Sequence, residues 1–133
     1  MSQTVPIDAV RPSQLYLNSA KLTGVIDWFD FDEPDYWALP VLEHDGDPYL
    51  TDGHTRAFVA YLAGVEELRI VRDDTAFDRT DRLLYHECLG WCASEDIMTV
   101  RDLAGRVLGP RAYEERWIDR CHRTAKLISK SNK

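Results

Sequence analysis

The hydrophobic positions of this chain repeat first with a helical period. Four apolar residues after position 19 occupy the i, i+3, i+4, i+7 spacing of a helix with one buried face. They are Leu22, Val25, Ile26 and Phe29. Ser19 is a common residue type at a helix start, and the acidic segment 30–35 ends the pattern. We therefore predict a helix that begins at Ser19, preceded by a short strand over 5–10.

A hairpin signal follows the acidic segment. The β-type segments 36–43 and 48–51 flank the sequence His-Asp-Gly-Asp at 44–47. An Asp-Gly pair favours a tight turn between strands, because glycine accepts a positive φ at little cost. The sequence therefore predicts two antiparallel strands joined by this turn.

The rest of the pattern is mainly helical. The apolar run 57–62 ends before Gly64, a natural C-terminal cap, and segment 67–71 reads as a further strand. Three more helices are predicted, over 79–93, 100–107 and 111–128. Together these elements predict an α/β (α+β) fold with a small mixed sheet and C-terminal helices. We expect one domain, residues 1–133, with the α/β part at 5–75 and the helical part at 76–129.

Composition agrees with a water-soluble globular protein. The chain has 133 residues, 44% of them hydrophobic, and its 16 basic and 23 acidic side chains give a formal charge of −7. A chain of this length buries enough surface to fold without disulfides or metals. Neither a membrane-spanning apolar stretch nor a signal peptide is visible, so we expect a cytoplasmic protein that does not bind a membrane. The three cysteines are expected to be reduced thiols.

Net acidity argues against a protein held mainly by nucleic-acid phosphates. Basic residues are nevertheless frequent between 106 and 133, and a helix there could present a basic stripe to nucleic acid. A solvated helix face is the alternative interpretation of the same charges.

The segment 49–57 carries the most informative chemistry. It joins a strand end to a helix start through Asp52-Gly53-His54-Thr55-Arg56. The free N–H groups and the dipole of a helix N-terminus form an anion site, and a glycine there lets a phosphate approach the backbone. Arg56 and Thr55 could add donors, and His54 a phosphate contact or a proton shuttle. Alternatively, Asp52 only caps the helix and Arg56 only pairs with a surface acid.

These residues resemble a known family. The box Thr-Asp-Gly-His-Thr-Arg-Ala at 51–57, the following Ala-Gly at 63–64 and the strand at 67–71 resemble the ParB/sulfiredoxin superfamily. Segments 10–15 and 39–41 resemble the opening segment and the hairpin strand of that superfamily, so the likeness spans about residues 5–73. Residues beyond it resemble a small bacterial subgroup of ParB-like proteins.

The branches of that superfamily imply different activities. Sulfiredoxins carry a reactive cysteine where this chain has His54, which argues against sulfiredoxin activity. ParB partition proteins bind a cytidine nucleotide with a Gly-Glu-Arg-Arg box, of which only Gly53 and Arg56 are matched. Free-serine kinases carry Asp-Gly-His-His-Arg, which 52–56 matches at four of five positions. Their catalytic carboxylate aligns at or near Gln14, which cannot take a proton.

Two functional hypotheses follow. In the first, the protein is a small phosphotransferase that moves phosphate from ATP, ADP or CTP to a hydroxyl-bearing small molecule. Gly53, Thr55 and Arg56 would bind phosphate, and Asp52 or His54 would orient or deprotonate the acceptor. In the second, the same turn serves a non-catalytic module that binds a nucleotide or a protein. The acidic segment 30–35 could hold Mg²⁺ with the nucleotide phosphates, or it is a solvated loop.

Two other groups of residues have a structural interpretation. Cys88 and Cys92 lie four apart on one helical face, and with His86 and the Cys121-His122 pair they are numerous enough for a zinc site. The spacing instead favours packing, because Cys behaves as a small hydrophobe on a buried stripe. We therefore predict no metal site. The four tryptophans are expected to pack in the core or at its rim rather than to stack on bases.

Overall fold

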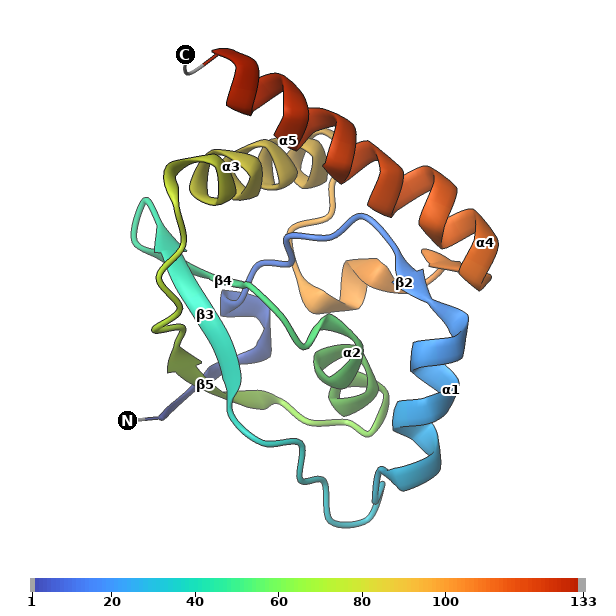
Figure 1. The fold of residues 1–133 in the computed structure, drawn as a ribbon. Helices are drawn as coiled ribbons and strands as arrows, with labels where there is room; N and C mark the ends of the chain where they lie inside the picture. Colours follow the sequence, from blue (N-terminus) through green and yellow to red (C-terminus); the bar gives the residue numbers. More distant parts are fainter. Residues whose placement is uncertain (1, 132–133) are drawn as a thin grey trace.

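The protein is described here from a computed structural model, which covers residues 2–131. Four strands form a mixed sheet in the order β1 (Gln3–Pro6), β5 (Glu67–Arg72), β3 (Leu39–His44) and β4 (Asp47–Leu50). The β3 and β5 strands are parallel, whereas β1 and β4 pair antiparallel at the two edges. The expected small mixed sheet with C-terminal helices, an α+β fold, is confirmed (Figure 1).

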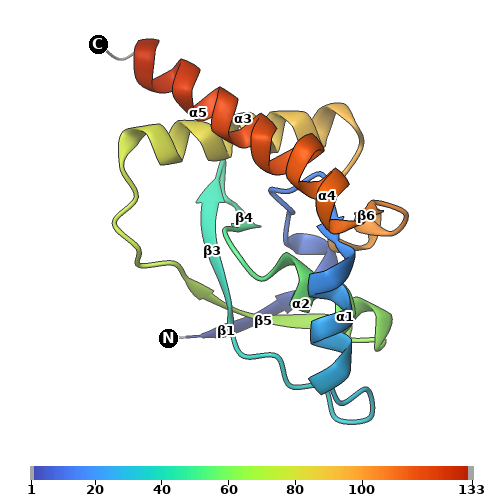
Figure 2. The ribbon, with the colours of Figure 1, turned by 45° about the vertical axis from the view of Figure 1, so that its right-hand side comes forward.

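Helices cover one side and one end of this sheet (Figures 1 and 2). The α2 helix (His54–Leu62) lies between the sheet and α1 (Ser19–Trp28), as Figures 1 and 2 show. The α3 helix (Arg79–Ser94) packs side by side with α5 (Asp119–Ser131) across one end of the molecule. A short parallel pair of β2 (Leu17–Asn18) and β6 (Val107–Leu108) ties the N-terminal part to the helical part.

The hairpin and the helix starts follow the predicted local chemistry. Asp45 and Gly46 have φ values of 52° and 85°, as the tight turn between β3 and β4 requires. The α1 helix begins at Ser19, where the side chain of Asn18 accepts a hydrogen bond from the Ala20 N–H. Gly64 follows α2 with a φ of 85°, which confirms its predicted place at the helix end.

Three predicted elements are corrected. The first strand ends at Pro6, and residues 7–9 form a 3-10 turn. The hairpin strand predicted to begin at 36 begins at Leu39, because Trp37 has a φ of 57° that no strand accommodates. The predicted helix 100–107 is a 3-10 turn over Val100–Leu103 followed by β6. Local periodicity could not show that residues 107–108 pair with a strand about ninety positions earlier.

The last predicted helix is longer and less regular than expected. It comprises α4 (Pro110–Tyr113), a π-helical segment (Glu114–Ile118) and α5, which extends to Ser131. Residues 129–131 thus extend the helix beyond the predicted end at 128, and residues 132 and 133 lie outside the described part. A π segment has more residues per turn than an α-helix, so positions four apart remain on one face. Tyr113, Trp117 and Cys121 accordingly line the same cavity.

The core lies between the sheet, α2 and the helical end. Its largest fully buried side chains are Val10, Pro12, Leu15, Leu17, Leu39, Leu50, Val59, Leu68, Ile70, Cys92, Val100 and Leu103. The predicted apolar face of α1 is only partly buried, because Ile26 is 40% exposed while Phe29 is buried. Within the described residues, none of the helices has the length and apolar character that a membrane span requires.

Candidate functional site

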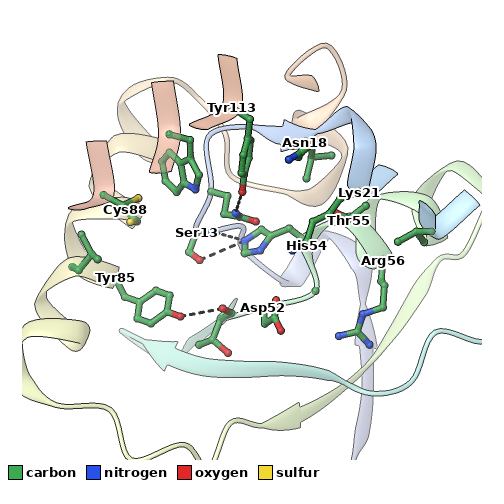
Figure 3. Close-up of a pocket in the computed structure, with 18 of the residues that line it drawn as sticks. Ser13, Asn18, Lys21, Asp52, His54, Thr55, Arg56, Tyr85, Cys88 and Tyr113 are labelled. Atoms are coloured by element: carbon green, nitrogen blue, oxygen red, sulfur yellow. Dashed lines mark hydrogen bonds between the residues drawn. The ribbon is translucent and has the colours of Figure 1, made fainter. Parts of the chain in front are cut away.

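A pocket of about 590 Å³ opens between α1, the N-terminus of α2, and the helical end of the molecule. This volume falls in the range of small-molecule sites. All five residues of the box 52–56 line it, together with Ser13, Gln14, Leu17, Asn18, Lys21, Val25, Trp28, Thr51, Phe77, Asp81, Leu84, Tyr85, Cys88, Tyr113, Trp117 and Cys121 (Figure 3). The structure thus brings every predicted site residue to one cavity.

The N-terminus of α2 faces this cavity without a side-chain cap. Gly53 is the N-cap residue, and having no side chain it cannot accept a hydrogen bond from the first turn. The N–H of Ala57 reaches the Gly53 carbonyl, which closes the first turn of the helix. Residues 54–56 therefore present backbone N–H groups without an intrahelical acceptor, the arrangement that binds anions.

Gly53 is required by packing as well as by the turn. Its φ is 78°, in the left-handed region. A Cβ at this position would lie 2.8 Å from Nη2 of Arg56 and 2.9 Å from Cδ2 of Leu39. The sequence analysis expected this glycine to let a phosphate approach the backbone. The structure adds a second reason for glycine, because the side chains of Arg56 and Leu39 occupy the space that a Cβ would need.

His54 is buried and has a structural partner. Its Nε2 accepts a 2.8 Å hydrogen bond from the backbone N–H of Ser13, and its side chain is almost fully excluded from solvent. Burial lowers the pKa of His54 to about 3, against a smaller opposing effect of the Asp52 carboxylate. The ring is therefore neutral with its proton on Nδ1, and neither nitrogen keeps a free lone pair. This geometry suits a residue that positions the turn and does not suit a general base.

Arg56 and Thr55 are half-buried in the pocket wall. Nη1 of Arg56 donates a 2.7 Å hydrogen bond to the backbone carbonyl of Tyr36. The alternative in which Arg56 pairs with a surface acid is therefore wrong, because its partner is a backbone carbonyl. This hydrogen bond fixes the guanidinium to the loop before β3. The Arg56 side chain also lines the pocket.

Asp52 is the exposed carboxylate of the box. Among residues 2–131 its side chain makes neither a hydrogen bond nor an ion pair, so it does not cap α2. Asp81, the other carboxylate of the pocket lining, accepts a hydrogen bond from the Asp78 N–H at the start of α3. Asp52 therefore keeps both oxygens available to a ligand.

Two further pocket residues come from outside the box 52–56. The side-chain amide of Gln14 donates a 2.7 Å hydrogen bond to the hydroxyl of Tyr113, whose pKa burial raises. Lys21 contributes an exposed ammonium group from α1, and its charge adds to burial in lowering the pKa of His54. The spacing of Lys21, Val25 and Trp28 at i, i+4, i+7 is the sequence signal that could have identified this wall.

The opposite wall is held by a hydrogen-bonded chain. The hydroxyl of Tyr85 donates to the Thr51 carbonyl at 3.0 Å, and the hydroxyl of Thr51 donates to Asp73. Burial, with a smaller effect of Asp73, raises the pKa of Tyr85. The phenol is therefore a neutral hydrogen-bonding group at physiological pH.

The acidic loop lies elsewhere. None of its residues lines the pocket, and Asp30 instead accepts hydrogen bonds from the N–H groups of Asp32 and Glu33. Asp35 forms an ion pair with Arg69 at 3.0 Å. Within the described part of the chain, no group of three or more His, Cys, Asp or Glu side chains is arranged to hold a metal ion.

The cysteines pack between α3 and α5. Cys88 and Cys92 are buried, whereas Cys121 is half-buried. The thiols of Cys88 and Cys121 interact at the pocket wall, and this hydrogen bond together with burial raises the pKa of Cys88. The same hydrogen bond lowers the pKa of Cys121. No zinc ligand set is formed by these residues within 2–131.

Part of the basic stripe is used inside the molecule. The guanidinium of Arg120 lies 3.9 Å from the ring centre of Trp91, and that of Arg116 lies 4.9 Å from Tyr16. Arg106 pairs with Glu95 at 2.7 Å. Of these three basic groups, only Arg106 has its charge paired with a carboxylate.

Comparison with known proteins gives a fold likeness. No family model matches this chain, and no curated protein does. Among solved structures, the chain is similar to the crystal structure of protein Atu1540 from Agrobacterium tumefaciens, with a TM-score of 0.53 and 19% sequence identity. The match covers 77% of this chain and 61% of that one, so this chain spans less than two thirds of its length. At this identity the likeness concerns the fold alone.

Proposed function

We propose that the pocket binds a nucleotide, ATP, ADP or CTP, with its phosphates at the N-terminus of α2. The observation that carries the proposal is the uncapped first turn of α2, which opens into a cavity of about 590 Å³. A bound anion would accept hydrogen bonds from the backbone N–H groups of 54–56 and interact favourably with the helix dipole.

Side chains around this turn add the groups that phosphates need. Lys21 supplies a positive charge, Arg56 the free donors of its guanidinium, and Thr55 a hydroxyl. The resemblance of 52–56 to the box of the free-serine kinases supports the same ligand. Mg²⁺ bound together with the nucleotide would neutralise phosphate charge. A nucleotide also agrees with the cytoplasmic location expected from the sequence.

The sharper form of the proposal is phosphoryl transfer to a small hydroxyl compound. The acceptor oxygen would attack phosphorus, the bond to the leaving phosphate oxygen would break, and the acceptor proton would pass to Asp52. Asp52 suits this role because its carboxylate is exposed in the pocket and has no partner among residues 2–131. His54 would keep the turn in place through its hydrogen bond with Ser13.

A non-catalytic nucleotide-binding module is the second candidate. It is favoured by Gln14, which lines the pocket where the resemblance expects a carboxylate and whose amide is bonded to Tyr113. An amide cannot accept the proton of a hydroxyl group. Phosphate binding needs no such acceptor, so the module requires only the uncapped turn and the positive side chains.

Binding is tested by thermal denaturation with ATP, ADP and CTP, with and without Mg²⁺. A ligand that binds only the folded protein at 100 times its Kd stabilises it by about 2.7 kcal/mol, or about 10 °C for a chain of this size. Lys21→Gln should weaken binding about tenfold, the value of one charge-assisted hydrogen bond. Lys130→Gln is the matched control and should leave binding unchanged, because Lys130 is exposed near the end of α5 and does not line the pocket. Absence of any shift with all three nucleotides would refute the proposal.

Catalysis is tested with Asp52→Asn, which keeps the size of the side chain and removes the base. The assay measures transfer of labelled terminal phosphate to serine, threonine and related hydroxyl compounds. In an enzyme, Asp52→Asn should lower the rate by about 10²–10⁴-fold with little change in nucleotide affinity. Nucleotide binding without transfer to any acceptor would identify the module instead.

A further inference from the structure

Exposed tryptophans gather where α1 ends and the following loop enters the sheet. Trp28 is 46% exposed and Trp37 is 66% exposed, so these two depart from the packing role that the sequence predicted for the tryptophans. Their ring centres lie 5.3 Å apart, with the ring planes inclined at 51°. Large aromatic side chains are seldom left this exposed together unless the surface binds something. This pair, Trp28 and Trp37, is called the tryptophan pair below.

The tryptophan pair is continuous with the pocket. Trp28 lines the cavity on the same face of α1 as Val25 and Lys21. At 1.5 Å per residue, the face from Lys21 to Trp28 is about 10 Å long, comparable to the reach of a nucleotide from phosphate to base. At the other end, Lys21 is close enough to the start of α2 that its charge adds to burial in lowering the pKa of His54. The phosphate site and the tryptophan pair therefore occupy two ends of one wall.

The loop that carries Trp37 is fixed from both sides. The carbonyl of Tyr36 accepts the hydrogen bond of Arg56, and the hydroxyl of Tyr36 accepts one from the Arg69 N–H at 3.1 Å. Tyr36 itself is buried, so its neighbour is held in place. Trp37 has a φ of 57°, a conformation that tryptophan rarely adopts and that persists only where the surroundings impose it. The box residue Arg56 is thereby linked to the tryptophan pair.

We propose that the tryptophan pair is the platform on which the base of the nucleotide stacks. This inference rests on the nucleotide binding proposed above and identifies the residues that hold the other end of the ligand. A base is a planar π system, and tryptophan rings provide the face and the edge on which such a system packs. Stacking does not read hydrogen bonds on a base, so purine and pyrimidine nucleotides should both bind, the larger purine more tightly.

The test compares ATP with inorganic tripolyphosphate, which has the phosphates but no base. Titration calorimetry on the wild-type protein should show ATP binding about 5- to 150-fold more tightly, the range for one stacked base. Trp37→Ala should remove most of that preference and leave tripolyphosphate affinity unchanged. Leu127→Ala is the control, because Leu127 is 65% exposed on α5 and not in the loop that carries Trp37. Tryptophan fluorescence of the wild type should change with ATP and not with tripolyphosphate.

The outcomes separate the two proposals. If tripolyphosphate and ATP bind equally, or if Trp37→Ala weakens both alike, the stacking platform is wrong while phosphate binding at α2 stands. If neither ligand binds the wild-type protein, the nucleotide proposal fails and this inference fails with it. Equal wild-type affinities for the two ligands refute the platform without any variant. If Trp37→Ala fails to fold, Trp28→Ala removes the other ring of the pair and should lose the same preference for ATP.

Discussion

The glycine at the start of α2 offers a sharp test of the site geometry. Replacing Gly53 with alanine places a Cβ in a backbone with φ of 78°. A residue other than glycine in this left-handed region costs about 1–2 kcal/mol. The new Cβ would also lie 2.9 Å from Cδ2 of Leu39, a fully buried side chain in a filled core. Overpacking of this kind costs about 1–3 kcal/mol more.

Gly64→Ala is the matched control for the backbone contribution. Gly64 has a φ of 85° but nothing within 4 Å of its Cβ position, so its replacement should cost only the strain. The lost flexibility of the unfolded chain is the same for both substitutions and cancels in their difference. We therefore expect Gly53→Ala to destabilise the protein by about 1–3 kcal/mol more than Gly64→Ala does.

Urea denaturation followed by circular dichroism measures both free energies of unfolding. Equal m-values would show that the substitutions leave the unfolded state comparable. Arg56→Ala combined with Gly53→Ala should recover little stability, because it relieves only the contact with Nη2 and loses the hydrogen bond to Tyr36, whereas the contact with Leu39 remains. If Gly53→Ala is no more destabilising than Gly64→Ala, the close packing described for the turn is wrong.

Two further predictions follow from the pKa shifts of buried groups. His54 has a folded pKa of about 3 against an ordinary 6.5, so the unfolded state binds a proton more tightly and stability is lost as pH falls through 6.5. Between pH 7.5 and 5.5 the loss should be about 1 kcal/mol, and urea titrations of His54→Gln should lack it. The cysteines should differ in reactivity, because hydrogen bonding lowers the pKa of Cys121 whereas burial raises that of Cys92 to about 12. Thiol labelling followed by mass spectrometry should modify Cys121 first, and faster labelling of Cys92 would contradict the packing.

The predictable parts of the fold were those governed by local chemistry. The Asp-Gly turn, the helix start at Ser19 and the cap at Gly64 depend on neighbours within a few residues, and the structure confirms each. The β6 strand depends instead on pairing with Leu17–Asn18, which no local pattern records. The π segment Glu114–Ile118 was not predicted either, because its apolar spacing also fits an α-helix.

The candidate site also has one part that the sequence could predict and one part that it could not. The box 52–56 is contiguous, so its place at a helix N-terminus could be derived from residue types alone. Its surroundings come from α1, α3 and the 113–121 segment, which are distant in sequence, and only the tertiary structure assembles them. The role of His54 could not be derived from the sequence either, because it depends on a hydrogen bond from Ser13, forty-one positions away.

The contacts inside the pocket leave one carboxylate as a candidate general base. A general base needs a lone pair that is free and a pKa that allows it to take a proton. His54 has its Nε2 lone pair engaged by Ser13, and Gln14 has none that is basic. Asp81 is tied to the start of α3, so among the described residues lining the pocket only Asp52 keeps a free carboxylate. Phosphoryl transfer assisted by a carboxylate would therefore depend on Asp52 at this site, whereas the proposed nucleotide binding would depend on the backbone of α2 and should survive the loss of Asp52.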